Sequence, residues 1–118
     1  MIDGDTVELF NGTVLRYVGI TAPEEGKSFA EEATKLNKEL VEGKEIKLEY
    51  DNYTSDKFGR ILAYPIIDNK NICIELVQKG MAELVIYQKR KPFIYQVQLL
   101  EAQEQAKKSK LGIWKNSN

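Results

Sequence analysis

The chain has 118 residues, a net charge of −1, no histidine and a single cysteine. Its length matches one domain of roughly 100–150 residues, so we expect residues 1–118 to form a single domain. The absence of histidine excludes a Ser-His-Asp triad, a Cys-His dyad and any imidazole base. Cys73 alone can form neither an internal disulfide nor a Cys/His zinc site. Catalysis in this chain must therefore use carboxylates, arginine, lysine, tyrosine, hydroxyl groups or a hard metal ion.

The remaining composition is that of a globular protein, with 42% hydrophobic and 30% charged residues. No apolar run approaches the roughly 20 residues that cross a bilayer, so no membrane partner is expected. The first residues have neither the basic nor the apolar region of a signal peptide, although secretion after removal of a leader would leave no trace.

The charge is unevenly distributed along the chain. Residues 88–118 carry seven basic and two acidic side chains. This excess favours a polyanion as partner, with a solvated helix face as the simpler alternative.

The first predicted elements are two strands joined by a tight turn. Val7 and Leu9 alternate with polar residues, which predicts a strand, and residues 13–20 predict the strand that returns beside it. Asn11-Gly12 lies between them, and both residues tolerate the positive φ angles of a type I′ turn. We therefore expect a β-hairpin in this part of the chain.

A helix is expected over residues 28–42. Apolar residues recur there at helical spacing, which predicts a helix that packs on one side. Ser28 followed by Glu31 has the pattern of a capping box at the start of this helix, and Gly43 is placed to end it.

The second half of the chain alternates strands with helices. Asp68-Asn69 predicts a turn, and Pro92 suits the start of a helix. We expect strands over residues 46–50, 59–67 and 81–87 and helices over residues 72–79 and 93–109. The resulting order is β-β-α-β-β-α-β-α, in which helices lie between hairpins and do not follow every strand. This order favours an α+β or mainly β fold, a five-stranded OB-fold Greek-key barrel with three α-helices, over a parallel sheet.

Arg16 is an unusual residue within the second predicted strand. It is in phase with Val14 and Val18, which places it on the side of the strand that is expected to face the core. A charged side chain in that position requires an anionic partner.

Five blocks of sequence occur in an order that covers nearly the whole chain. They are residues 2–7, 16–24, 56–64, 75–82 and 101–114. Together they resemble the thermonuclease family, the staphylococcal (micrococcal) nuclease-like domains. The resemblance implies a monomer with the OB barrel and three helices, which hydrolyses DNA or RNA phosphodiesters with Ca²⁺ and leaves a 3′-phosphate. Family domains carry strand residues before Ile2, so we expect that either the first strand is truncated or the barrel is completed in another way.

The resemblance assigns catalytic roles that suit phosphodiester hydrolysis. Asp5 matches a calcium-ligand carboxylate, with Asp3 as a supporting carboxylate, and such oxygen donors suit a hard cation. Glu24 matches the residue that positions the attacking water, and it is the candidate general base. Arg16 and Arg60 match two arginines that hold the phosphate, because a guanidinium makes bidentate bonds to phosphate oxygens and keeps its charge.

The expected metal site departs from the family pattern at one position. Thr21 stands where a second calcium-ligand Asp is usual, which removes one negative charge from the site. The main-chain carbonyl of Ala22 matches another metal ligand and does not depend on the side chain. The expected ligands are therefore Asp5, Thr21 and Ala22. Weakened, substrate-assisted binding of Ca²⁺ and complete loss of the metal both remain open at this point.

Four further residues are expected to bind the substrate. Lys57 matches a lysine that contacts a terminal phosphate, and Phe58 replaces a tyrosine, which keeps stacking but removes one hydrogen bond. Tyr87 and Tyr95 lie near the positions of base-stacking tyrosines, with packing inside the fold as the alternative.

Two functions are compatible with these residues. The first is a calcium-dependent nuclease, which is favoured because Glu24, Arg16 and Arg60 occur together. The second is a catalytically inactive OB-fold module that binds nucleic acid or a protein partner. Thr21, Phe58 and the acidic net charge favour this second function.

Overall fold

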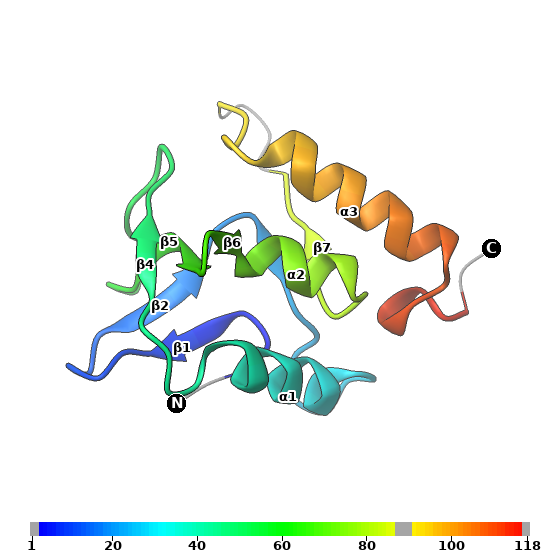
Figure 1. The fold of residues 1–118 in the computed structure, drawn as a ribbon, viewed down its shortest axis with the longest axis horizontal. Helices are drawn as coiled ribbons and strands as arrows, with labels where there is room; N and C mark the ends of the chain where they lie inside the picture. The colour runs from blue at the N-terminus through cyan, green and yellow to red at the C-terminus, as the bar shows by residue number, and fades with distance from the viewer. Residues whose placement is uncertain (1–2, 87–90, 117–118) are drawn as a thin grey trace.

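The main sheet forms around the seven-residue strand β5 (Ile61–Ile67). The computed structural model describes residues 3–86 and 91–116. Its main sheet has the strand order β1-β2-β5-β4, with β6 also paired to β5 (Figure 1). These strands are β1 (Thr6–Glu8), β2 (Val14–Tyr17), β4 (Lys47–Glu49) and β6 (Lys70–Asn71). β2 and β5 run parallel, whereas β1 with β2 and β4 with β5 run antiparallel, so the sheet is mixed.

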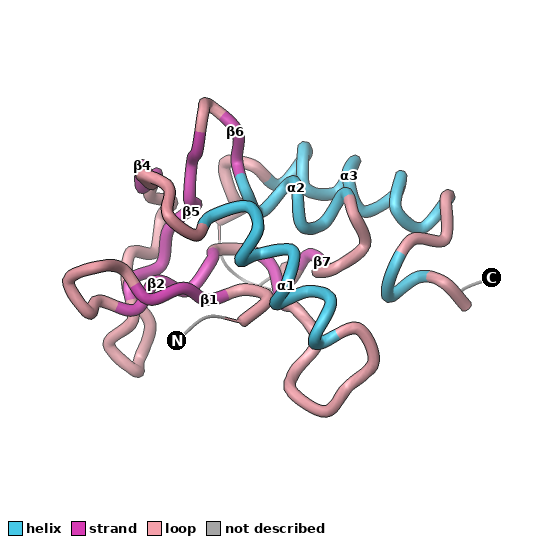
Figure 2. The backbone as a smooth tube through the Cα atoms, turned by 60° about the horizontal axis from the view of Figure 1, so that its bottom comes forward, coloured by secondary structure: helices cyan, strands magenta, loops and turns pink. Residues whose placement is uncertain are grey.

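A second sheet and three helices complete the fold. β3 (Ile20–Thr21) pairs antiparallel with β7 (Glu83–Leu84). The helices are α1 (Ala30–Val41), α2 (Ile72–Gln78) and α3 (Gln96–Lys108), followed by the 3₁₀ turn η1 (Gly112–Trp114). α2 lies between α1 and α3 (Figures 1 and 2). The fold is therefore α+β with an OB-like arrangement of strands, and no helix in the described ranges is long and apolar enough to cross a membrane.

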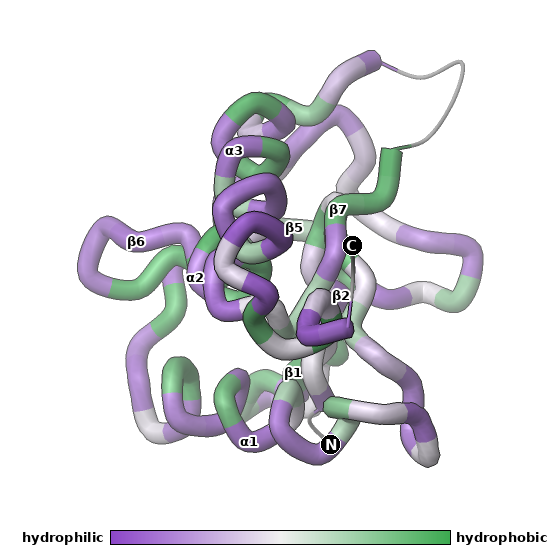
Figure 3. Tube along the Cα trace, turned by 90° about the vertical axis from the view of Figure 1, so that its right-hand side faces the viewer, coloured by the Kyte–Doolittle hydropathy of each residue, from purple (hydrophilic) through white to green (hydrophobic). Residues whose placement is uncertain are grey.

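The core lies between the main sheet and the helices. Hydrophobic stretches lie next to α2 and β5, whereas the β6 turn is hydrophilic (Figure 3). Fully buried side chains come from both layers: Leu15, Tyr17, Tyr64, Leu76 and Leu99. Burial of each large apolar side chain stabilises the fold by about 1.5–3 kcal/mol.

The first hairpin turns differently from the expected type I′ geometry. Gly12 has a positive φ of 85°, but Asn11 does not. The Gly12 amide donates to the Leu9 carbonyl (2.9 Å), and the Leu9 amide donates to the Thr13 carbonyl (2.8 Å). The turn is thus centred on Phe10 and Asn11, and Gly12 forms a bulge after it. The Asn-Gly pair marks the hairpin correctly, but only the glycine takes the left-handed conformation.

The expected capping box at the start of α1 is wrong. The residue before the helix is Phe29, in a left-handed conformation (φ 69°), and no side chain caps the first turn. Ser28 lies one residue too early, because a turn in which the Ala30 amide donates to the Lys27 carbonyl (3.2 Å) leads the chain into the helix. The helix ends as expected before Gly43, whose φ is 74°.

Other boundaries also differ from the sequence-based expectation. Of the strand expected over residues 81–87, the described part forms only β7 (Glu83–Leu84). The strand expected over residues 13–20 breaks at Gly19, whose φ of 79° separates β2 from β3. The last helix begins at Gln96, because residues 93–96 form a turn in which the Gln96 amide donates to the Phe93 carbonyl (3.0 Å). Pro92 therefore precedes that turn and does not begin the helix.

The OB-like sheet is open along one seam. Among the described residues, β1 and β4 are the two ends of the strand order, and a groove of about 650 Å³ lies between them. Apolar side chains line this groove: Val7, Leu9, Val41, Ile46 and Leu48. Among the described residues, no backbone pairing therefore joins β1 to β4 to close the sheet into a barrel.

Two glycines join the end of α2 to the turn η1. Gly80 has a φ of 77°, and its carbonyl accepts a hydrogen bond from the Ile113 amide (2.8 Å). A Cβ atom on Gly80 would overlap the Leu111 carbonyl, and one on Gly112 would overlap the Gly80 carbonyl. The two backbones therefore touch directly, and we call this contact the glycine clasp.

Candidate active site

A cavity of about 920 Å³ opens beside the N-terminal end of β1 and the first turns of α1. Its walls combine acidic, basic and small residues. They include six residues predicted from the sequence to form the site: Asp5, Arg16, Thr21, Ala22, Glu24 and Arg60. The fold therefore brings all of the expected catalytic and metal-binding positions to one place.

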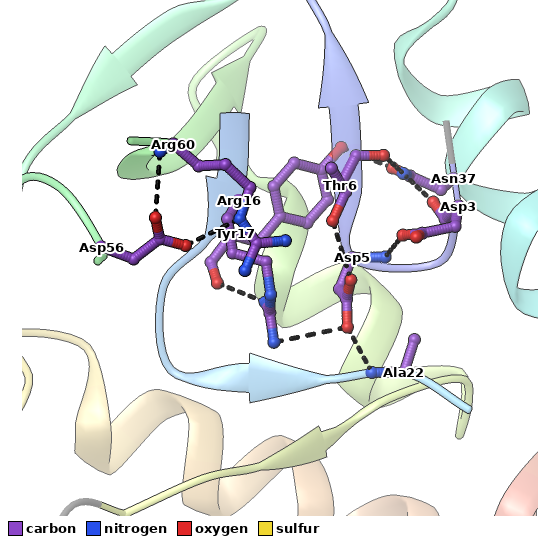
Figure 4. A network of polar contacts seen from close by, with 9 residues as sticks. All are labelled: Asp3, Asp5, Thr6, Arg16, Tyr17, Ala22, Asn37, Asp56 and Arg60. Carbon is purple, nitrogen blue, oxygen red and sulfur yellow. Dashed lines mark hydrogen bonds and ion pairs between the residues drawn. The ribbon is translucent and has the colours of Figure 1, made fainter. Parts of the chain in front are cut away.

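The Asp5 carboxylate lines this cavity and lies between Thr6, Arg16 and Ala22 (Figure 4). One oxygen, Oδ1, accepts a hydrogen bond from the Thr6 hydroxyl (3.0 Å). The other, Oδ2, accepts a hydrogen bond from the Ala22 amide (2.8 Å) and lies 3.4 Å from Nη2 of Arg16. Burial raises the pKa of Asp5; Arg16 and the Ala22 amide oppose this shift, and the nearby Asp3 carboxylate adds to it.

Asp5 is held by residues 3–6, which we call the carboxylate turn. The Asp5 amide donates to Oδ1 of Asp3 (3.0 Å), and the Asp3 amide donates to the Thr6 carbonyl (3.0 Å). Gly4 lies so close to its neighbours that an added Cβ would be 2.5 Å from the Cβ of Ala22 and 2.9 Å from that of Ala33. Only glycine allows the turn to dock between β3 and α1 in this way.

Arg16 faces the cavity and not the core. Alternation in β2 buries Leu15 and Tyr17, which leaves Arg16 on the opposite face with 19% of its side chain exposed. The expectation that Arg16 shares the core side of the strand is therefore wrong. Its required anionic partner is present as Asp5, and its Nη1 also donates to the Tyr17 carbonyl (2.7 Å). These contacts fix the direction of the guanidinium.

Arg60 is oriented by Asp56, a residue that the sequence-based prediction did not include. Oδ1 of Asp56 accepts hydrogen bonds from the Phe58 and Arg60 amides (both 2.9 Å), and Oδ2 accepts one from Nε of Arg60 (2.7 Å). Partial desolvation would raise the pKa of Asp56, but these hydrogen bonds and the Arg60 charge together hold it below its usual value. Since Nε is engaged, the terminal nitrogens of Arg60 stay available to a ligand.

Glu24 lies at the rim of the cavity, where it is exposed to solvent. Its carbonyl accepts a hydrogen bond from the Lys27 amide (2.9 Å), which closes the turn that leads towards α1. Within residues 3–86 and 91–116 its carboxylate has no hydrogen-bond or ion-pair partner. A carboxylate with free oxygen atoms beside a cavity can accept a proton from a bound water molecule.

Lys57 and Phe58 lie next to Arg60 and outside the cavity lining. Nζ of Lys57 is 5.3 Å from the centre of the Phe58 ring, and Cζ of Arg60 is 5.6 Å from it. The ring is 73% exposed, so it offers an open surface between two cations.

The two expected stacking tyrosines are not brought to the cavity by the described structure. Tyr87 lies outside the described residues. The Tyr95 hydroxyl donates to both carboxylate oxygens of Glu49 (2.5 and 2.7 Å), which raises its pKa to about 12, and its ring packs edge-on against Tyr64. In this position Tyr95 joins α3 to the sheet.

Sequence reasoning also missed Asn37, which is fully buried on α1. Its side chain contacts the carboxylate turn, which no local pattern in the sequence predicts. One signal was present: Asn37 lies four residues after Ala33 and four before Val41, in the buried stripe of the helix. A polar residue in such a stripe must have a specific partner.

The oxygen donors beside Asp5 fit a hard cation, but they are few. Asp3 and Asp5 are neighbouring carboxylates whose mutual repulsion raises the pKa of Asp5, and a cation would relieve that repulsion. Thr21 adds a neutral side chain to the same cavity. No group of three or more acidic, cysteine or histidine side chains gathers as a metal site in the described part of the chain. Water and a substrate phosphate would have to complete the coordination.

One family model and several bacterial proteins are similar to this chain over most of its length. A family model described as staphylococcal nuclease homologue matches residues 14–116. Endonuclease YncB of Bacillus subtilis (strain 168) is 37% identical over 98% of this chain and 59% of its own length. The SPbeta prophage-derived endonuclease YokF of the same organism is 36% identical over 96% of this chain and 41% of its own length. The thermonuclease of Staphylococcus hyicus is 32% identical over 98% of this chain and 73% of its own length. The chain thus spans about half the length of the first two relatives.

Proposed function

The chain belongs to the staphylococcal nuclease family, and on that basis we propose that it is a nuclease that hydrolyses phosphodiester bonds of DNA or RNA. The observation that carries this proposal is the shared cavity, which holds Arg16, Arg60 and the carboxylate of Glu24, for which the described residues supply no partner. Two fixed cations beside a free base are what hydrolysis of a phosphodiester requires.

Arg16 and Arg60 would bind the scissile phosphate. Each guanidinium is already oriented, Arg16 by Asp5 and the Tyr17 carbonyl and Arg60 by Asp56. Because these groups are fixed before the reaction, they can stabilise the extra negative charge of the transition state without reorganisation.

Glu24 would act as the general base. It takes one proton from a water molecule, whose oxygen then forms a bond to phosphorus while the bond to the 5′ oxygen breaks. The leaving oxygen takes up a proton from solvent, and the product keeps a 3′-phosphate. The exposure of Glu24 supports this role because water has direct access to it.

Ca²⁺ is part of this proposal, held by Asp5 with Thr21 and the Ala22 main chain. When bound, it would supply positive charge to a phosphate oxygen and to the attacking water. Since the acidic donors are few, we expect weak binding of Ca²⁺ alone and tighter binding with substrate.

The alternative is an inactive module that binds nucleic acid without cutting it. Thr21 favours this alternative, because the site has one carboxylate fewer than the family pattern. The two functions differ in one measurable outcome, which is cleavage.

The deciding experiment incubates the protein with a labelled single-stranded DNA in the presence of Ca²⁺ or a chelator. The proposal expects cleavage only with Ca²⁺ and a large loss in Glu24→Gln. Glu25→Gln is the matched control, because Glu25 is also exposed and lines the same cavity. Binding of DNA without cleavage at millimolar Ca²⁺ would reject the nuclease and leave the binding module.

A further inference from the structure

Asn37 connects helix α1 to the carboxylate turn through two hydrogen bonds and to Tyr17 of β2 through a third. Its Nδ2 donates to the carbonyls of Asp3 (2.6 Å) and Thr6 (3.4 Å), and its Oδ1 accepts from the Tyr17 hydroxyl (2.6 Å). Asn37 is 0% exposed and Tyr17 is 1% exposed, so water cannot replace these bonds (Figure 4).

The chemistry of these contacts requires an amide at position 37. The two carbonyls of the turn need a donor, and the Tyr17 hydroxyl needs an acceptor, which a carboxamide provides together. Aspartate has the same shape but would place an oxygen against two carbonyl oxygens. An apolar residue would leave the Asp3 carbonyl and the Tyr17 hydroxyl without their Asn37 partner, which is costly inside a protein, and would leave the Thr6 carbonyl with the Asp3 amide as its donor.

The same turn determines where the Asp5 carboxylate lies. Asp5 is between the two residues whose carbonyls Asn37 binds, and the Tyr17 amide donates to the Asp5 carbonyl (2.9 Å). Tyr17 therefore holds the turn twice, once through its backbone and once through Asn37. With the backbone fixed on both sides, Oδ2 of Asp5 is aimed at the Ala22 amide and Arg16.

Resting on the proposed function, we propose that Asn37 and Tyr17 are positioning residues that hold the carboxylate turn so that Asp5 faces the cation and the phosphate. They touch neither the cavity nor a reacting atom among the contacts described. Their effect is transmitted through the backbone of residues 3–6, in the way that the outer partners of a metal ligand set its direction.

The test compares Asn37→Asp and Tyr17→Phe with the wild type. Asn71→Ala is the matched control, because Asn71 is also a buried asparagine (7% exposed), and it caps α2 by accepting from the Cys73 amide (2.8 Å). Three quantities are measured below the melting temperature: affinity for Ca²⁺ alone by calorimetry, the Ala22 amide signal and its hydrogen exchange by NMR, and kcat separately from KM on DNA.

We expect Asn37→Asp to lower the affinity for Ca²⁺ and kcat by about 10-fold to 100-fold, with a smaller loss in Tyr17→Phe. The Ala22 amide should lose protection and shift in both variants, because its bond to Asp5 loosens. Asn71→Ala should lower the melting temperature and leave all three quantities unchanged.

The inference fails if both variants merely lower the melting temperature, as the control does, while Ca²⁺ affinity, kcat and the Ala22 amide stay unchanged. If Asn37→Asp does not fold, Tyr17→Phe tests the inference instead, because this variant removes only the hydroxyl that donates to Asn37. If the wild type neither cleaves DNA nor binds Ca²⁺, the nuclease proposal fails, and the Ala22 amide alone decides whether the pair positions Asp5.

Discussion

Gly4→Ala tests whether the close docking of the carboxylate turn matters for activity. The new Cβ would lie 2.5 Å from the Cβ of Ala22 and 2.9 Å from that of Ala33. Carbon atoms in contact are about 3.5–4.0 Å apart, so the turn must move by roughly 1 Å. Overpacking of this kind costs about 1–3 kcal/mol in the free energy of unfolding. A displacement of about 1 Å at a reacting site can lower the rate by roughly 100-fold, which is the loss of kcat that we expect.

The assay measures kcat on single-stranded DNA and the free energy of unfolding by urea denaturation. Gly43→Ala is the control, because Gly43 has a φ of 74° and no atom within 4 Å of an added Cβ. It should lose about 1–2 kcal/mol of stability from backbone strain and keep its kcat. Adding Ala22→Gly to Gly4→Ala removes the nearer overlap and should recover part of the activity. Full activity in Gly4→Ala would refute the reasoning, since it would mean that the turn tolerates the displacement.

Three other variants test separate parts of the site. Asp5→Asn should abolish Ca²⁺ binding yet raise the free energy of unfolding at neutral pH. The sign of this change follows from the raised pKa of Asp5. The native state binds the Asp5 proton more tightly than the unfolded state does. The free energy of unfolding of the wild type therefore falls as the pH rises from 3.8, the ordinary pKa of this group, through the raised pKa. Thermal unfolding at a series of pH values measures this difference in stability. A lower stability of Asp5→Asn than of the wild type at neutral pH would contradict the expectation. Thr21→Asp should increase Ca²⁺ affinity and rate because it adds a charged ligand, and an unchanged calorimetric affinity would mean that Thr21 is not the weak point. Asp56→Ala should lower kcat about tenfold by releasing Arg60, and unchanged steady-state kinetics would show that Arg60 needs no such support.

Much of the fold can be predicted from local patterns in the sequence. The hairpin, α1 and α2 and the turn before β6 occur where alternation, helical spacing and turn residues place them. The positive φ angles of Asp68 (51°) and Asn69 (64°) illustrate why: these residue types tolerate that conformation, so the turn is encoded locally. Boundaries such as the left-handed Phe29 depend on how the preceding loop packs, which local patterns do not contain.

The sequence names residues that the fold gathers around one cavity, but it does not reveal the residues that hold them in place. Asp5 and Arg60 could be identified from ordered sequence blocks, whereas Asn37 acts through contacts 34 and 31 residues away in the sequence. Tyr95 shows the same limit, because its hydroxyl finds Glu49 at a separation of 46 residues. Such partners are set by the packing of helices on the sheet, and a single sequence does not reveal which helix face meets which turn.

The glycine clasp has a consequence for how the protein is made. A ribosome adds about 5–20 residues per second, so α2 leaves the exit tunnel seconds before the segment that carries Ile113. During this interval Leu76 and Val77, which are fully buried in the finished protein, lack the cover that α3 gives to α2. The nascent chain therefore exposes the apolar face of α2 until α3 has been made. That exposure ends when α3 packs on α2 and the Ile113 amide of η1 reaches the Gly80 carbonyl.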